Sequence, residues 1–141
     1  MQVRDIMNTE VATATAETPI GQVAKLMADQ DVGSVVILDG SRPVGIVTDR
    51  DLVINHLAKG HTQEHAVREA VSGGGAFSGL VTIRPDLDVL EAAQELGRQK
   101  VGRLPVVEGD RLVGILSAGD LAKQLRGALD GLLAEGEKAE Q

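Results

Sequence analysis

The sequence predicts an α+β protein built from two copies of one β-α-β-β-α unit. The segment VGSVVILDGSRPVGIVTDRDL (32–52) aligns without a gap to VGRLPVVEGDRLVGILSAGDL (101–121), at a constant offset of 69 residues. Strand and helix periodicities also occur in the same order in both copies. At 141 residues the chain has the length of one compact protein, so both copies are expected to contribute to one folded whole.

Each copy is expected to begin with a short strand and an amphipathic helix. The strands are VATAT (11–15) and LVTI (80–83). Apolar residues recur at helical spacing over 20–27 and 89–96, which predicts one buried face on each helix. The expected helix starts are Thr18-Pro19 and Asp88, and the expected stops are Gly33 and Gly102.

A hairpin and a second helix complete each copy. Asp39-Gly40 and Glu108-Gly109 lie between apolar runs and predict the hairpin turns. The second helices are expected from about 49 to 58 and from about 120 to 133, with fraying from Glu135 onward.

The copies differ in the segment that precedes the first strand of each copy. The second copy carries a glycine-rich insertion, SGGGAFSG (72–79), which we interpret as a flexible surface loop because it lacks the spacing of a phosphate-binding loop. The resulting assignment is 1–66 for the first repeat with an N-terminal segment, 67–127 for the second repeat, and 128–141 for a helical or frayed tail.

Composition excludes several classes of function. The net charge of −7 and the aromatic content of 1% disfavour binding of nucleic acid, which needs clustered cations or stacking rings. The absence of cysteine excludes disulfides and thiolate nucleophiles. We expect a cytoplasmic protein without a membrane partner, since no apolar run approaches about 18 residues and the start lacks a secretory signal.

A repeated motif ends each hairpin. It reads Gly45-Ile-Val-Thr48-Asp-Arg-Asp51 in the first copy and Gly114-Ile-Leu-Ser117-Ala-Gly-Asp120 in the second. A hydroxyl residue followed three positions later by an acid is typical of a helix capping box. The same groups could bind a ligand, because a hydroxyl at a helix start suits phosphate and a carboxylate one turn later can accept both ribose hydroxyls. The two interpretations are compatible.

The motifs GIVTDRDL and GILSAGDL, the segment RLPVVEGDRLVG and the element order resemble the tandem cystathionine-β-synthase (CBS) domain pair, or Bateman module. The resemblance covers the chain from VRDIM to about Leu125. It implies two clefts between repeats related by a pseudo-two-fold axis, which bind AMP, ADP, ATP or S-adenosylmethionine as regulatory ligands, with no required cofactor. It places Thr48, Arg50, Asp51, Thr82, Arg103, Leu104 and Pro105 at the first cleft, and Ser117, Asp120, Thr13, Ser34, Val35 and Val36 at the second.

The resemblance also implies a role for each kind of residue. Asp51 and Asp120 would hold ribose, Thr48 and Ser117 would meet phosphate, and the aliphatic residues would contact adenine. We predict tighter binding of phosphorylated ligands at the first cleft, because Arg50 and Arg103 lie there, with Arg84 and Lys100 near. The second cleft offers Gly119 and Ser34 at the positions of the two arginines.

Other motifs are weaker. His61-Thr-Gln-Glu64-His65 fits the HxxEH spacing of a zinc peptidase class but lacks an obvious third ligand and a peptidase-sized scaffold. No metal site is assigned from this motif. A weak zinc site at the surface, formed by these histidines together with His56, is left as an alternative. The acids at 29, 31, 49 and 51 lack calcium-loop spacing. No nucleophile elbow is present, so we do not expect an enzyme.

These observations favour a regulatory module that senses an adenosine-containing molecule and signals to an unknown effector protein. The resemblance implies association through apolar helix faces, so a homodimer is expected. The alternative is a ligand-free dimerisation or scaffold protein with the same fold.

Overall fold

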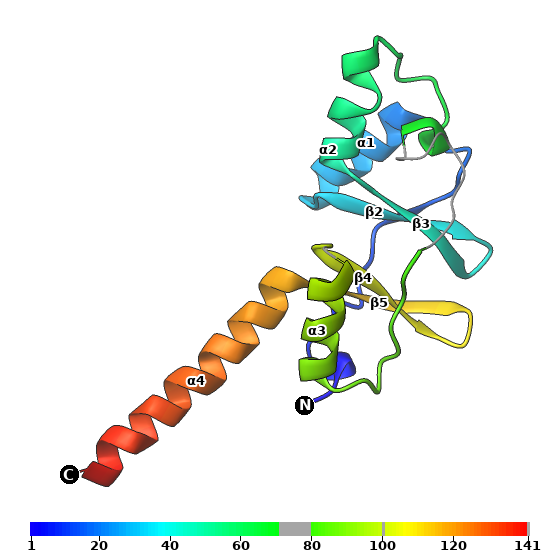
Figure 1. Cartoon of the computed structure of the whole chain (residues 1–141). Helices are drawn as coiled ribbons and strands as arrows, with labels where there is room; N and C mark the ends of the chain where they lie inside the picture. Colours follow the sequence, from blue (N-terminus) through cyan, green and yellow to red (C-terminus); the bar gives the residue numbers. More distant parts are fainter. Residues whose placement is uncertain (71–79, 100, 141) are drawn as a thin grey trace. The chain divides into compact units, whose positions relative to one another are not determined.

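A computed structural model describes residues 1–70, 80–99 and 101–140 (Figure 1). The glycine-rich insertion (72–79) and Lys100 lie outside the described residues. The chain divides into two compact units. The first-repeat unit contains Glu10–Val81 and Glu108–Leu112, and the second-repeat unit contains Met1–Thr9, Thr82–Val107 and Val113–Gln141.

The first-repeat unit has the predicted β-α-β-β-α order. Its sheet has the strand order β1-β2-β3, with β1 parallel to β2 and β2 antiparallel to β3. Two short 3-10 helices follow α2 and lead toward the second repeat. The elements are β1 (Thr13–Ala14), α1 (Ile20–Gln30), β2 (Ser34–Asp39), β3 (Arg42–Thr48), α2 (Asp49–Ile54), η2 (Leu57–Lys59) and η3 (Val67–Ala70).

Helix α1 buries its apolar face against the sheet. Ile20, Val23 and Met27 recur at helical spacing and are buried in one core with Ile37 and Val47 of the strands. Figure 1 shows α1 and α2 beside the β2–β3 hairpin. The predicted buried face is therefore confirmed at these three residues, but Ala24, which was also expected on it, is exposed.

The end of α1 differs from the prediction. The helix stops at Gln30, and the next residue, Asp31, adopts the left-handed conformation with φ of 53°. Its backbone N–H donates to the carbonyls of the last turn, as a C-terminal cap does. Gly33 was wrongly expected to supply this cap, because aspartate tolerates the left-handed region better than most residues.

Two further boundaries in the first-repeat unit were predicted wrongly. The hairpin turns at Gly40 (φ 64°) and Ser41, one residue later than expected, because Asp39 still pairs with Arg42. Helix α2 ends at Ile54 and does not continue to 58. A second short turn follows and ends at Gly60, whose φ of 78° favours glycine.

The second-repeat unit repeats the order with a reduced first strand. Its predicted strand over 80–83 forms only one parallel bridge among the described residues, between Ile83 and Val106. The N-terminal residues pack in this unit, where Asn8 forms an antiparallel bridge with Ile115. The elements are η1 (Val3–Asp5), α3 (Val89–Gln99), β4 (Arg103–Glu108), β5 (Arg111–Ser117) and α4 (Ala118–Glu140).

Helix ends also differ in the second-repeat unit. Helix α3 stops at Gln99, three residues before the expected glycine stop at Gly102. Helix α4 begins at Ala118 and continues to Glu140, so the expected end near 133 was wrong, and the tail is helical as far as Glu140 (Figure 1). Alanine and leucine, which favour helix, recur along its last turns. Among the described residues, no helix is long and apolar enough to cross a membrane.

Gly114 has a steric role in the second-repeat unit. A Cβ atom at this position would lie 2.7 Å from Met7 Sδ and 3.1 Å from the Asn8 carbonyl oxygen. The N-terminal segment crosses β5 here, and the Asn8 and Ile115 backbones exchange two hydrogen bonds of 2.9 Å. The glycine of the repeated motif is therefore required in this copy by close backbone approach.

Candidate functional site

The first copy of the repeated motif is a complete capping box. Thr48 is the N-cap of α2, and its Oγ1 accepts the Asp51 backbone N–H at 3.1 Å. The Asp51 Oδ2 atom accepts the Thr48 backbone N–H at 2.9 Å. This confirms the capping interpretation and holds both side chains, each half-buried, in fixed positions at the end of β3.

The second carboxylate oxygen of Asp51 accepts a hydrogen bond from another residue of the same unit. Its Oδ1 accepts from Asn55 Nδ2 at 3.4 Å, near the limit for a hydrogen bond. The same Asn55 amide nitrogen donates to the Ala70 carbonyl at 3.2 Å, which ties α2 to the end of η3. A carboxylate oxygen accepts two hydrogen bonds, so the capping bond leaves Asp51 able to accept ribose hydroxyls.

The other predicted residues of the first-repeat unit lie beside this motif in the sheet. Ser34 pairs with Thr48 across β2 and β3, and Thr13 pairs with Val36 across β1 and β2. The Asp49 backbone N–H donates to the Gly33 carbonyl at 3.0 Å and closes this end of the sheet. The structure therefore brings the predicted residues of this unit to neighbouring strands.

Val35 and Val36 have different surroundings although both are fully buried. Val35 belongs to the core formed with α1, together with Ile37. Successive side chains of a strand point to opposite faces, so Val36 and Ser34 point away from that core. The Val35 side chain is therefore not available to a ligand.

The second-repeat unit contains the matching motif. The Asp120 backbone N–H donates to Ser117 Oγ at 3.0 Å, so the serine caps α4. The Ala118 backbone N–H donates to the Gly102 carbonyl at 2.8 Å, which reproduces the Asp49 bond at the offset of the repeat. The hydroxyl cap and the bond to the glycine carbonyl therefore recur in the second copy, whereas the reciprocal bond from the acid is found among the described residues only in the first copy.

The remaining predicted residues lie near β4. The Ile83 backbone N–H, next to Thr82, donates to the Pro105 carbonyl at 3.1 Å. Leu104 and Pro105 are buried, and Arg103 is half-buried. Each predicted cleft takes its residues from both units, so the two clefts stay predictions.

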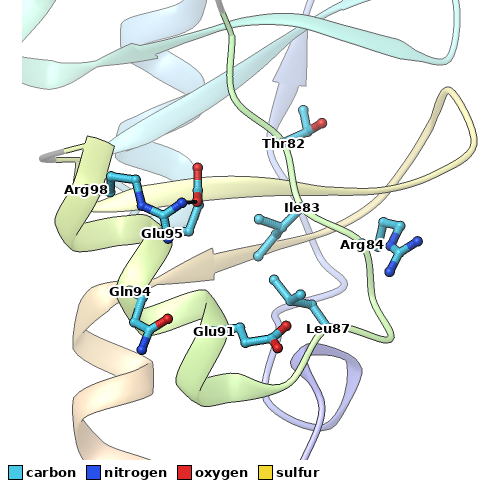
Figure 2. Close-up of a pocket in the computed structure, with 8 residues that line it drawn as sticks. All are labelled: Thr82, Ile83, Arg84, Leu87, Glu91, Gln94, Glu95 and Arg98. Carbon is cyan, nitrogen blue, oxygen red and sulfur yellow. Dashed lines mark ion pairs between the residues drawn. The ribbon is translucent and has the colours of Figure 1, made fainter.

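The structure contains a separate pocket in the second-repeat unit. It has a volume of about 450 Å³ and lies between α3 and the extended segment that precedes it (Figure 2). Figure 2 shows Thr82 at one end, and it is joined in the lining by Arg84, which was expected near the first cleft. The lining residues are Thr82, Ile83, Arg84, Leu87, Glu91, Gln94, Glu95 and Arg98.

Charge makes this pocket a poor phosphate site. Arg98 pairs with Glu95 at 3.0 Å, and Arg84 pairs with Asp86 at 3.3 Å. Glu91 adds a carboxylate to the lining, as the close-up shows (Figure 2). Because both arginines are paired with acids, a phosphate would meet little uncompensated positive charge here.

The connector after α2 (residues 60–66) brings together the three histidines of the weak surface metal site that the sequence left open. One ring nitrogen of each of His56, His61 and His65 lies within 4.8 Å of the other two. His61 and His65 lie in a turn and not on a helix, so the helical basis of the HxxEH motif is absent here. A chain reversal between His56 and His61 could have been suspected from Gly60, but the convergence of all three rings depends on the fold.

Comparison with known proteins identifies the family. The CBS domain family matches residues 3–55 and 77–127. The chain belongs to the CBS domain family. As a CBS pair it is 33% identical over 120 residues to the CBS domain-containing protein YhcV of Bacillus subtilis, covering 85% of this chain and 82% of that protein.

Two solved structures have the same fold. Hypoxic Response Protein I, whose crystal structure contains two coordinated zinc ions, is 31% identical with a TM-score of 0.73, covering 87% of this chain and 98% of that one. The CBS domain pair of protein MJ0100, in complex with 5-methylthioadenosine and S-adenosyl-L-methionine, is 24% identical with a TM-score of 0.78. That match covers 91% of this chain and 98% of the MJ0100 chain. The two-repeat α+β fold predicted from the sequence is confirmed.

Proposed function

We propose that this CBS pair is a cytoplasmic regulatory module that binds an adenosine-containing ligand, AMP, ADP, ATP or S-adenosylmethionine, in clefts between its repeats. The observation that carries the proposal is the repeated hydroxyl–acid pair, Thr48 with Asp51 and Ser117 with Asp120, at matching helix starts. The adenosine compounds bound by the MJ0100 pair support the choice of ligand class.

The predicted residues suit the ribose, the adenine and the phosphate of such a ligand. A carboxylate accepts hydrogen bonds from the two adjacent hydroxyls of ribose, and Asp51 is held ready for this by its own capping bonds. The buried aliphatic residues Val36 and Leu104 suit an adenine ring, because the chain has almost no aromatic side chains for stacking. Arg50 and Arg103 would make the first cleft the stronger site for phosphate.

Thermal unfolding with a panel of adenosine compounds tests this function. A ligand at 100 times its dissociation constant should stabilise the protein by roughly 2.7 kcal/mol, because it binds the folded state alone. Guanosine compounds of equal charge are the control for non-specific anion effects. If no adenosine compound shifts the midpoint, and mass spectrometry finds none released from the purified protein, the sensing function is wrong.

A second candidate function is ligand-free dimerisation, and α4 favours it. Every residue from Ala122 to Gly136 is exposed, although the segment contains Leu129 (54% exposed), Leu132 (69%) and Leu133 (58%). These leucines and Leu125 recur at helical spacing and form one apolar stripe. An isolated helix of this length is marginal in water, so the stripe is expected to be covered.

We propose that a second copy of the chain covers this stripe. An apolar groove of about 340 Å³ lies next to it between α3 and α4, with small residues that allow close approach. The exposed part of α4 carries two cations, Lys123 and Arg126, followed by two anions, Asp130 and Glu135. An antiparallel pair of α4 helices would place opposite charges near each other, which is the arrangement of a two-fold dimer.

Placing charge on the stripe should dissociate the dimer. Leu129→Glu with Leu132→Glu would bury carboxylates against the partner helix, so we expect a monomer at concentrations where the parent chain is a dimer. Light scattering coupled to size exclusion measures this. Gln124→Glu with Ala134→Glu adds the same charge on the opposite face of α4 and should stay dimeric. A monomeric parent chain at micromolar concentration would rule out the interface.

A further inference from the structure

All three histidines of the chain meet in one cluster of the first-repeat unit. The 141 residues include three histidines and no cysteine. His56 lies between α2 and η2, and His61 and His65 lie in the connector that follows. Their ring centroids are 5.1 to 5.3 Å apart. Any imidazole chemistry of this protein is therefore concentrated at one place.

His56 is arranged as a metal ligand. Its side chain is fully buried, and its Nε2 is hydrogen-bonded to the Thr62 carbonyl, which can only accept. Nε2 therefore carries the proton, and in the neutral ring Nδ1 has a free lone pair. That Nδ1 atom is buried and has no hydrogen-bond partner. A backbone carbonyl that accepts a hydrogen bond from one ring nitrogen, and so fixes the tautomer, is the usual support of a metal-binding imidazole.

The other two histidines complete an accessible set of ligands. His65 is half-buried, and its Nδ1 makes no hydrogen bond but lies 3.4 Å from Glu69 Oε2. His61 is exposed, so the cluster opens to solvent on its side.

We propose that His56, His61 and His65 form a zinc site with three imidazole ligands and an open position. Three neutral imidazoles without thiolate are a donor set that suits zinc, and a fourth position is then filled by water or a further ligand. When three nitrogens lie within 4.8 Å of one another, there is a position no more than about 2.8 Å from each of them. Since Zn–N bonds are about 2.0–2.1 Å, each ring needs to move inward by less than about 1 Å.

The zinc ion would hold the connector on α1. The first backbone N–H groups of α1 donate to this connector, from Ile20 to the His65 carbonyl and from Gly21 to the Gln63 carbonyl, both at 2.9 Å. These donors have no partner inside the helix, so the connector satisfies them. A metal bond between His56 and the connector would fix the segment that makes these contacts.

Zinc binding by the full chain without a histidine tag tests the site. Equilibrium dialysis against zinc chloride, with metal content measured by mass spectrometry, should give about one zinc per chain. His61→Ala removes an exposed ligand without opening the core and should weaken zinc binding by at least about 100-fold. Zinc should also raise the unfolding midpoint of the parent chain and not that of His61→Ala.

Two controls separate a metal site from ring packing and from surface charge. His61→Phe keeps an aromatic ring in the cluster but has no nitrogen, so it should lose zinc as His61→Ala does. Asp29→Asn with Asp31→Asn removes two acids of the same unit and should leave zinc binding unchanged. The site is refuted if the parent chain binds no zinc at one equivalent, or if either His61 variant keeps the parent's affinity.

Discussion

Replacing Asp51 with alanine is expected to weaken adenine-nucleotide binding at the first cleft by about 5- to 150-fold, which corresponds to about 1 to 3 kcal/mol. The carboxylate is the group that would accept the two ribose hydroxyls, and its oxygens are already oriented by the Thr48 N–H and the Asn55 amide. Isothermal titration calorimetry with AMP and ATP measures the loss.

The design must separate ligand contact from folding, because Asp51 is also part of the capping box. Loss of the box should lower the stability of the protein by about 1 kcal/mol, which urea unfolding measures independently. Asp49→Ala is the matched control, since Asp49 is an exposed acid in the same turn and its carboxylate accepts only the neighbouring Arg50 N–H among the described residues. Equal losses of affinity in Asp49→Ala and Asp51→Ala would show a general charge effect and contradict the assignment.

Comparison with the second motif extends this experiment. Asp120→Ala should have the smaller effect on ATP, because the second cleft has Ser34 and Gly119 where the first has Arg103 and Arg50. A larger effect of Asp120→Ala than of Asp51→Ala would reverse the predicted order of the two clefts.

Replacing Gly114 with valine is expected to destabilise the second-repeat unit by about 1 to 3 kcal/mol. Met7 has a flexible side chain and can move away from a Cβ atom, but the Asn8 carbonyl at 3.1 Å is backbone and is held by its bond to Ile115. The two γ-methyl groups of valine would increase the overlap. Urea denaturation followed by circular dichroism measures the loss.

Gly127→Ala is the control for this substitution. Gly127 lies in α4, and a Cβ atom there would meet nothing within 4 Å. Alanine has a higher helix propensity than glycine by about 1 kcal/mol, so this variant should be equally or more stable than the parent. If Gly114→Val unfolds at the parent's urea concentration, the close approach of the N-terminal segment to β5 is not tight in solution.

The sequence predicted the repeated fold because the signals for it are local. Periodicity placed α1 and α3, the Gly40 turn placed the hairpin, and the Thr48–Asp51 spacing identified a capping box that the structure contains. The boundaries that failed depend on context. Asp31 takes a conformation that favours glycine, and α2 ends early where Asn55 and His56 bond to the connector and to η3.

The candidate sites were less accessible to sequence reasoning. A pattern of residue types could select Asp51 and Ser34, but it could not show that Val35 belongs to the helix-side core. Likewise, the spacing of His61 and His65 fits one face of a helix, and only the observed turn brings both rings to His56. Long-range packing decides these points, because it sets which side of an element each residue faces.

Asn55 links Asp51, a residue of the proposed ligand site, to the last turn of η3 by hydrogen bonds. Its single amide nitrogen divides its two protons between Asp51 Oδ1 and the Ala70 carbonyl. A ribose that takes over Oδ1 competes with the weaker of these bonds and frees the amide to reorient toward Ala70. Occupancy of one carboxylate oxygen would thus change the hydrogen bond that joins the end of α2 to the end of η3, so that Asn55 would couple the proposed ligand site to that segment.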